Sequence, residues 1–195
     1  MFADADRAQA LAERLHQGQR DGGGAPLIEH VRRVAAAVPR DARVVAWLHE
    51  VLEYTPISEE ALLAEGLSLD ELRALRLLTR EEDARSNATY LAHVELIARA
   101  KGAGANIARS VKLADLSDRT HHPSTRADGW SPPYERGLEI LRRAARHERS
   151  SPNGALEARA HTAPVADATI SAPAARAADR LTAGQSQRPA AEQGR

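Results

Sequence analysis

The segment AWLHEVLEY sets several ionisable side chains inside an otherwise apolar stretch. His49 and Glu50 are neighbours, and a continuous helix would place Glu53 one turn beyond His49 on the same face. Burying such groups among large aliphatic residues costs free energy unless a partner compensates the charge. A bound cation is one such partner, although the pattern taken alone also fits a structural or surface role.

Two other segments offer ligands of the same kind, His30 well before His49 and Asp115 in VKLADLSDR far after Glu50. The chain has no cysteine, which excludes disulfides, thiolate zinc sites and iron–sulfur clusters. Imidazoles together with carboxylates suit Mn²⁺, Fe²⁺ or Zn²⁺, and an incomplete protein shell leaves positions for water and a phosphate oxygen. These residue types would suit a divalent metal site if the fold brings them together, and by themselves they leave a structural or surface role open.

Four ordered segments match one pattern: LHQGQ from Leu15, GAPLIEH ending at His30, LHEVLEYT ending at Thr55, and KLAD ending at Asp115. With them, roughly residues 5 to 145 resemble the HD-domain superfamily, and most closely its small alarmone hydrolases related to RelA/SpoT proteins. Four segments in the right order are more specific than a single motif. His16, which opens the first motif, is expected to pack or hydrogen-bond rather than to bind metal.

The resemblance implies an all-helical fold and one metal, usually Mn²⁺, bound by His30, His49, Glu50 and Asp115. The family's best known reaction removes the 3′-pyrophosphate from guanosine tetra- or pentaphosphate. A divalent ion polarises the phosphoryl oxygen and lowers the pKa of its water. Glu53, outside the ligand set, could orient that water or accept its proton.

The sequence departs from the family pattern at two positions near the expected metal and its water. Glu50 stands where the family has Asp, and the added methylene displaces the ligand atom by about an ångström. Tyr54 stands where the family has a second catalytic carboxylate, and a phenol with a pKa of about 10 is mostly protonated at neutral pH. We therefore expect weakened or altered metal binding, and Glu53 and Tyr54 as the catalytic pair.

The other departures concern substrate binding. Asp21 takes the place of a basic residue that packs on guanine, with Arg20 beside it as a substitute. Arg119 replaces an Asn that contacts the nucleotide; it could grip a phosphate, or close the pocket through a salt bridge to Asp118 or another acid. Lys112 is a further phosphate contact, or equally a support for the Asp115 turn or a solvent-exposed lysine.

Apolar side chains recur at helical spacing through the first three quarters of the chain, without the alternating β-branched runs of strands. We expect an all-α, compact bundle of seven or eight helices. Capping residues, Gly and Pro place these helices at 5–16, 27–38, 42–54, from 59, from 69, 87–101, 106–118 and from 132.

Residues 149–195 are rich in Ala, Pro, Gly, Ser, Arg and Gln and hold few large aliphatic side chains. Such a segment cannot bury enough apolar surface to offset its conformational entropy. We expect a disordered tail after a helical domain at 1–148.

Lys plus Arg and Asp plus Glu both number 27, so no net positive charge favours nucleic acid. No apolar run is long enough to span a bilayer, and the chain starts without a basic, apolar leader. We expect a cytoplasmic protein whose partner is a phosphorylated small molecule, most simply a nucleotide.

The preferred hypothesis is a metal-dependent phosphohydrolase. The alternative is a degenerate HD module that binds a nucleotide or a partner helix without turnover. A structural helical protein with no site is a third interpretation.

Overall fold

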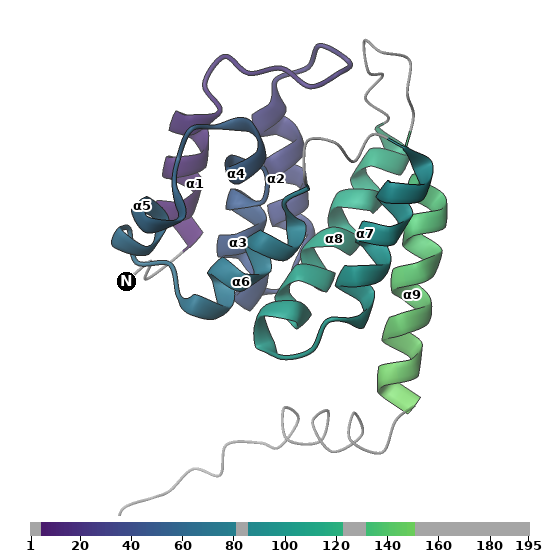
Figure 1. Cartoon of the computed structure of the whole chain (residues 1–195). Helices are drawn as coiled ribbons and strands as arrows, with labels where there is room; N and C mark the ends of the chain where they lie inside the picture. The colour runs from purple at the N-terminus through teal and green to yellow at the C-terminus, as the bar shows by residue number, and fades with distance from the viewer. Residues whose placement is uncertain (1–4, 81–85, 123–131, 151–195) are drawn as a thin grey trace, which may run out of the picture. The chain divides into compact units, whose positions relative to one another are not determined.

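The computed structural model describes residues 5–80, 86–122 and 132–150 (Figure 1). Within these ranges it contains nine α-helices, one short 3-10 helix and no strand, so the all-α prediction is confirmed. The helices are α1 (Ala5–Leu15), α2 (Leu27–Ala37), η1 (Arg40–Ala42), α3 (Arg43–Leu48), α4 (Val51–Tyr54), α5 (Glu59–Ala64), α6 (Leu69–Leu78), α7 (Asn87–Arg99), α8 (Ala103–His121) and α9 (Tyr134–Ser150).

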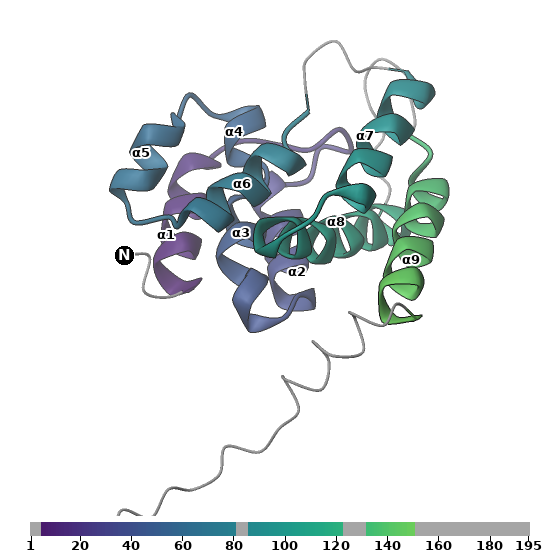
Figure 2. The ribbon, with the colours of Figure 1, turned by 60° about the horizontal axis from the view of Figure 1, so that its bottom comes forward.

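Helix α8 runs through the middle of the bundle and contacts α2, α3, α6, α7 and α9 (Figures 1 and 2). Its approach to α6 depends on Gly104, where an added Cβ would lie 2.5 Å from the backbone oxygen of Asp70. Because α8 is central, side chains on its several faces reach residues from distant parts of the sequence.

One apolar core joins these helices and extends from Ala8 in α1 to Leu141 in α9. Trp47 is buried in it, as expected from the sequence. A fully buried Leu, Ile or Val side chain contributes about 1.5–3 kcal/mol to the free energy of folding. The largest side chains with no exposure are Leu48, Leu62, Leu75, Ile97, Leu116 and Leu141.

The serine caps predicted from the sequence are confirmed. The Ser58 hydroxyl accepts the Ala61 N–H at the start of α5. Ser68 and Glu71 form the expected reciprocal capping box at the start of α6. Ser86 caps α7. Each cap satisfies backbone N–H groups that the first helical turn leaves unpaired, which fixes where these helices begin.

The prediction of one continuous helix over 42–54 is wrong. The segment forms η1, α3 and α4, and His49 and Glu50 lie in a turn between the last two. The His49 Nδ1–H donates to Ala46 O over 2.7 Å, and this carbonyl would accept the Glu50 N–H in a regular helix. The His49 side chain therefore competes with the backbone N–H of Glu50 for the Ala46 carbonyl at the point where the helix breaks.

Other boundaries also differ from the sequence expectations. Asp41 is not an N-cap, because it lies inside η1, which starts after the fixed φ of Pro39. Helix α8 begins after Gly102, three residues earlier than expected, and ends at His121. Helix α9 continues to Ser150, so residues 149 and 150 are helical and not part of a tail.

The rest of the predicted tail, residues 151–195, lies outside the described residues. Within the described helices, none combines the length and apolar character needed to cross a membrane.

Candidate metal centre

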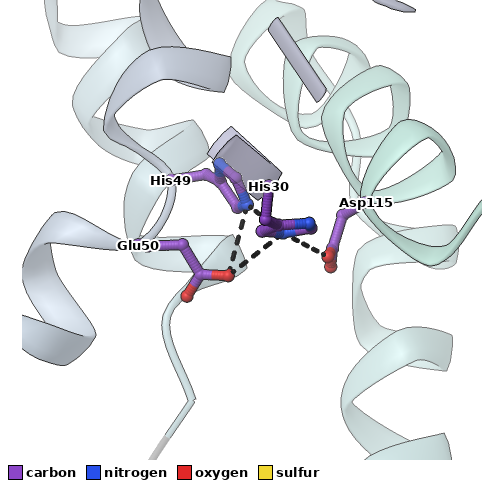
Figure 3. Close-up of side chains that lie close together, drawn as sticks. All are labelled: His30, His49, Glu50 and Asp115. Carbon is purple, nitrogen blue, oxygen red and sulfur yellow. Dashed lines mark hydrogen bonds and ion pairs between the residues drawn. The ribbon is translucent and has the colours of Figure 1, made fainter. Parts of the chain in front are cut away.

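Four side chains from three parts of the sequence converge in the bundle (Figure 3). His30 comes from α2, His49 and Glu50 from the turn after α3, and Asp115 from α8. All four are buried, and each offers a ligand atom within 4.8 Å of the other three. The predicted meeting of these residues is confirmed as a group that could hold a metal ion.

The spacing of the nitrogen and oxygen atoms fits a small divalent ion. His30 Nε2 lies 3.3 Å from Asp115 Oδ1, 3.5 Å from Glu50 Oε1 and 3.3 Å from His49 Nε2. His49 Nε2 lies 3.3 Å from Glu50 Oε1. Ligand atoms about 2.1 Å from a tetrahedral ion are about 3.4 Å apart, which matches these four separations.

Both imidazoles are held at Nδ1 so that Nε2 faces the cluster. The His30 Nδ1–H donates to Asp118 Oδ2 over 2.7 Å, and the His49 ring donates to a backbone carbonyl. Arg33 in turn donates to both oxygens of Asp118, over 2.6 and 2.9 Å. Such outer partners orient metal-binding histidines. Sequence reasoning missed this role of Asp118, although its place one turn after Asp115 was a usable signal.

The charges of the cluster shift its proton affinities. Burial and the Arg119 charge lower the pKa of His30, but hydrogen bonds to Asp115, Asp118 and Glu50 outweigh them and raise its pKa to about 10. Since a metal binds only neutral imidazole, binding here would release a proton.

The carboxylates are held in their charged forms. Burial raises the pKa of Asp115, but the charges of Lys112 and Arg119 outweigh this and bring the pKa well below its usual range. Burial also raises the pKa of Glu50, but the charges of Arg119 and His49 outweigh it and bring this pKa well below its usual range. Both groups are therefore anionic at neutral pH, as metal ligands must be.

Arg119 closes on the cluster instead of pointing away from it. Its Nε donates to Asp115 Oδ1 over 2.6 Å, and its Nη2 donates to Glu50 Oε1. The sequence left open whether Arg119 grips a phosphate or forms a salt bridge to Asp118 or another acid. The structure shows a salt bridge, and its partners are Asp115 and Glu50 rather than Asp118. Lys112 Nζ donates to Asp115 Oδ2 over 2.8 Å and so supports this carboxylate.

A cavity opens beside the cluster, and His49, Glu50 and Asp115 form part of its wall. Its other lining residues are Glu53, Tyr54, Leu78, Arg80, Tyr90, Lys112, Arg119, Pro132 and Tyr134. Three of these carry positive charge, and three present phenol groups. The same wall holds the carboxylates of Glu50, Glu53 and Asp115, which pair with the three positive groups.

The two predicted catalytic residues line this cavity. Glu53 Oε1 lies 2.6 Å from Arg80 Nη2, so its carboxylate is paired. Burial, together with the charges of Glu50 and Glu53, raises the pKa of Tyr54 to about 12. The phenol is therefore a neutral donor at physiological pH, as expected, and among the described lining residues the only carboxylates besides Glu53 are the candidate ligands Glu50 and Asp115.

Arg20 is not brought to the site. It is exposed, does not line the cavity, and donates to Gly24 O over 2.6 Å within its own loop. The neighbouring Asp21 accepts the N–H groups of Gly23 and Ala25. Both side chains stabilise the loop that leads into α2, and neither is placed to pack on a guanine base.

The first motif, His16–Gln19, is linked to the cavity wall through hydrogen bonds. His16 is buried, and its Nδ1 lies 2.7 Å from Gln19 Oε1. Gln19 Nε2 donates to Tyr54 O over 2.8 Å. This chain of hydrogen bonds ties the segment to the end of α4, which matches the hydrogen-bonding role expected for His16.

No protein-family model and no curated protein matches this chain. The resemblance to alarmone hydrolases thus stays a prediction from the four motifs. The convergence of His30, His49, Glu50 and Asp115 is an independent property of the fold.

Proposed function

We propose that this chain is a cytoplasmic, metal-dependent phosphohydrolase acting on a nucleotide or another phosphorylated small molecule, and that its metal is Mn²⁺. The observation that carries the proposal is the buried group of His30, His49, Glu50 and Asp115, with ligand atoms within 4.8 Å of one another. Two imidazoles and two carboxylates suit Mn²⁺, and Fe²⁺ or Zn²⁺ would also fit. When bound, such an ion supplies a Lewis acid that polarises a phosphoryl oxygen and acidifies water.

Glu53 is suited to handle the proton. It lines the cavity beside the cluster but is not one of the four ligands. Its pairing with Arg80 orients the carboxylate. A carboxylate in this position can orient water for attack on phosphorus and accept the proton that the attack releases.

The cavity is suited to a phosphate group. Arg80, Lys112 and Arg119 line it and carry positive charge. The protonated phenol of Tyr54 adds a neutral donor at the same wall. Charge-assisted hydrogen bonds from such groups bind phosphate oxygens more strongly than neutral donors do. The lining therefore favours a phosphorylated substrate, while Arg20 and Asp21 give no support for guanine selectivity.

A second candidate function is binding without turnover. The observation that favours it is the pairing of every charged group around the cluster: Glu53 with Arg80, and Glu50 and Asp115 with Arg119. A chain with these pairs, and with Tyr54 at the position of the second catalytic carboxylate, could hold a nucleotide and leave it intact.

The experiment is a hydrolysis assay of purified protein with Mn²⁺ and guanosine tetraphosphate, followed by other nucleotides. We expect release of pyrophosphate or phosphate, and we expect it to disappear in His49→Ala. The matched control is His147→Ala, because His147 is an exposed histidine on α9. Binding of nucleotide without release of product would favour the module. Equal activity in wild type and His49→Ala would contradict the proposed centre.

A further inference from the structure

The Glu50 and Asp115 oxygens that face the Nε2 atoms of the two imidazoles are the same two atoms that bind Arg119. Glu50 Oε1 lies 3.3 Å from His49 Nε2 and also accepts the Arg119 Nη2–H. Asp115 Oδ1 lies 3.3 Å from His30 Nε2 and also accepts the Arg119 Nε–H over 2.6 Å. Arg119 thus bridges the atoms that a metal would use.

In this position the Arg119 guanidinium occupies the oxygen atoms that a metal ion would need. The Arg119 side chain is 19% exposed, and the carboxylates that it joins are more deeply buried. Two positive groups sharing the same oxygen atoms repel each other, and water screens them poorly at a buried site. The guanidinium and a divalent ion therefore compete for Glu50 and Asp115.

A metal ion at the cluster would leave Arg119 without a partner while it keeps the neighbouring ion pairs. Lys112 is bound to the other oxygen of Asp115, Oδ2, and Arg80 is bound to Glu53, so a metal at the cluster leaves both pairs intact. Arg119 would lose its contacts with both carboxylates. A guanidinium without an anion is costly in a partly buried wall, and its planar fork suits two oxygens of a phosphate.

We propose that Arg119 holds Glu50 and Asp115 together in the absence of metal and moves to a phosphate group of the substrate when the metal binds. This inference rests on the proposed metal centre and adds a coupling to it. Because such coupling is reciprocal, metal would strengthen phosphate binding and phosphate would strengthen metal binding. Arg119 is then a residue that sets metal affinity and makes that affinity depend on substrate.

The test measures Mn²⁺ binding by isothermal titration calorimetry, with and without methylphosphonate, a phosphate analogue with no ester bond to hydrolyse. The proteins are wild type, Arg119→Gln, and the control Arg136→Gln, which removes a 63%-exposed arginine paired with Glu139. We expect Arg119→Gln to bind Mn²⁺ about ten-fold more tightly than wild type. We expect methylphosphonate to tighten Mn²⁺ binding by wild type and the control about five-fold or more, and to leave Arg119→Gln unchanged.

Mn²⁺ binding by Arg119→Gln that equals or falls below that of wild type would overturn the inference, and so would a methylphosphonate effect that survives the substitution. Arg119→Lys gives a second test if Arg119→Gln fails to fold, as judged by circular dichroism. Lysine keeps the charge but lacks the planar fork that holds the two carboxylates, so this variant should also bind Mn²⁺ more tightly than wild type, and no gain would contradict the inference.

His49→Ala separates the two proposals. If Mn²⁺ binding is lost in His49→Ala but unaffected by Arg119→Gln, the metal centre stands and the Arg119 inference fails. If neither wild type nor Arg119→Gln binds Mn²⁺, both fail.

Discussion

Asp118 Oδ2 lies 2.7 Å from His30 Nδ1, although the two residues are 88 positions apart in the chain. The contact orients the His30 ring, because the Nδ1–H donates to the carboxylate and Nε2 turns toward Asp115 and Glu50. Asp118 thereby positions a candidate metal ligand without belonging to the group of four.

Asp118→Asn should weaken Mn²⁺ binding by about 10–100-fold, the usual cost of losing an outer partner of a metal-binding histidine. The amide keeps the shape of the side chain but weakens the hydrogen bond that orients the ring. Calorimetric titration with Mn²⁺ measures the change. Asp41→Asn, at an exposed aspartate of η1, is the matched control. An Asp118→Asn affinity within a factor of two of wild type would show that the contact does not orient the ligand.

Glu50→Asp should weaken Mn²⁺ binding rather than improve it, although the HD-domain pattern that the sequence resembles has aspartate at this position. The carboxylate of Glu50 already reaches 3.3 Å from His49 Nε2 and 3.5 Å from His30 Nε2. A shorter side chain on the same turn would draw the oxygen back by about an ångström, more than a preorganised site tolerates. Titration of Glu50→Asp and Glu50→Gln tests this. Tighter binding by Glu50→Asp would mean that the turn adjusts freely.

Glu53→Gln should reduce hydrolysis without reducing Mn²⁺ affinity, because Glu53 lines the cavity and is not among the four candidate ligands. Loss of a general base lowers kcat by about 10²–10⁴-fold. The comparison requires kcat, KM and a Mn²⁺ titration on the same preparation. Glu139→Gln, at an exposed glutamate of α9, is the control. A variant that loses metal along with activity would argue for a structural role.

Gly104→Ala should destabilise the protein by about 1–3 kcal/mol, as overpacked sites do. The added Cβ would lie 2.5 Å from the Asp70 backbone oxygen, so α6 and α8 would have to separate. At Gly137 the nearest atom to an added Cβ is the end of the Leu116 side chain, at 2.9 Å, which can shift. Urea unfolding should therefore show a smaller loss for Gly137→Ala. Equal losses would indicate that backbone proximity at Gly104 is not decisive.

Stability should fall between pH 6.5 and 4 in part through His93. Burial and the Lys112 charge lower the pKa of His93 to about 4, against the opposing effect of its hydrogen bond to Leu77 O. The unfolded chain takes up this proton near pH 6.5 and the folded chain does not, so the contribution is present above pH 6.5 and lost as pH falls toward 4.

His93→Gln should remove this dependence, since glutamine can donate to Leu77 O but does not titrate. The free energy of unfolding of wild type should lose about 2–3 kcal/mol more than that of His93→Gln between pH 7 and pH 4. Urea midpoints at several pH values measure the difference, with the exposed His147→Gln as control. Parallel pH profiles of wild type and His93→Gln would rule out this contribution.

The sequence by itself determined the helical class, most helix starts and the identity of the candidate ligands. Ser58, Ser68 and Ser86 cap helices through contacts within three residues, so their effect is readable locally. The residue types at 30, 49, 50 and 115 restrict the chemistry to imidazole and carboxylate ligands wherever they lie.

Only the tertiary structure decided how these groups are paired. Asp115 lies one turn before Arg119 on α8, and the packing of α8 against the turn after α3 adds Glu50 as its second partner. The break at His49 depends on a side chain that takes a backbone carbonyl, which helical periodicity does not reveal. Arg20 follows a motif that matches the family pattern, which made it a candidate for substrate binding. In the fold it donates to Gly24 O within its own loop instead. Such pairings depend on distance and burial, which are set by the packing of the whole core rather than by neighbours in the chain.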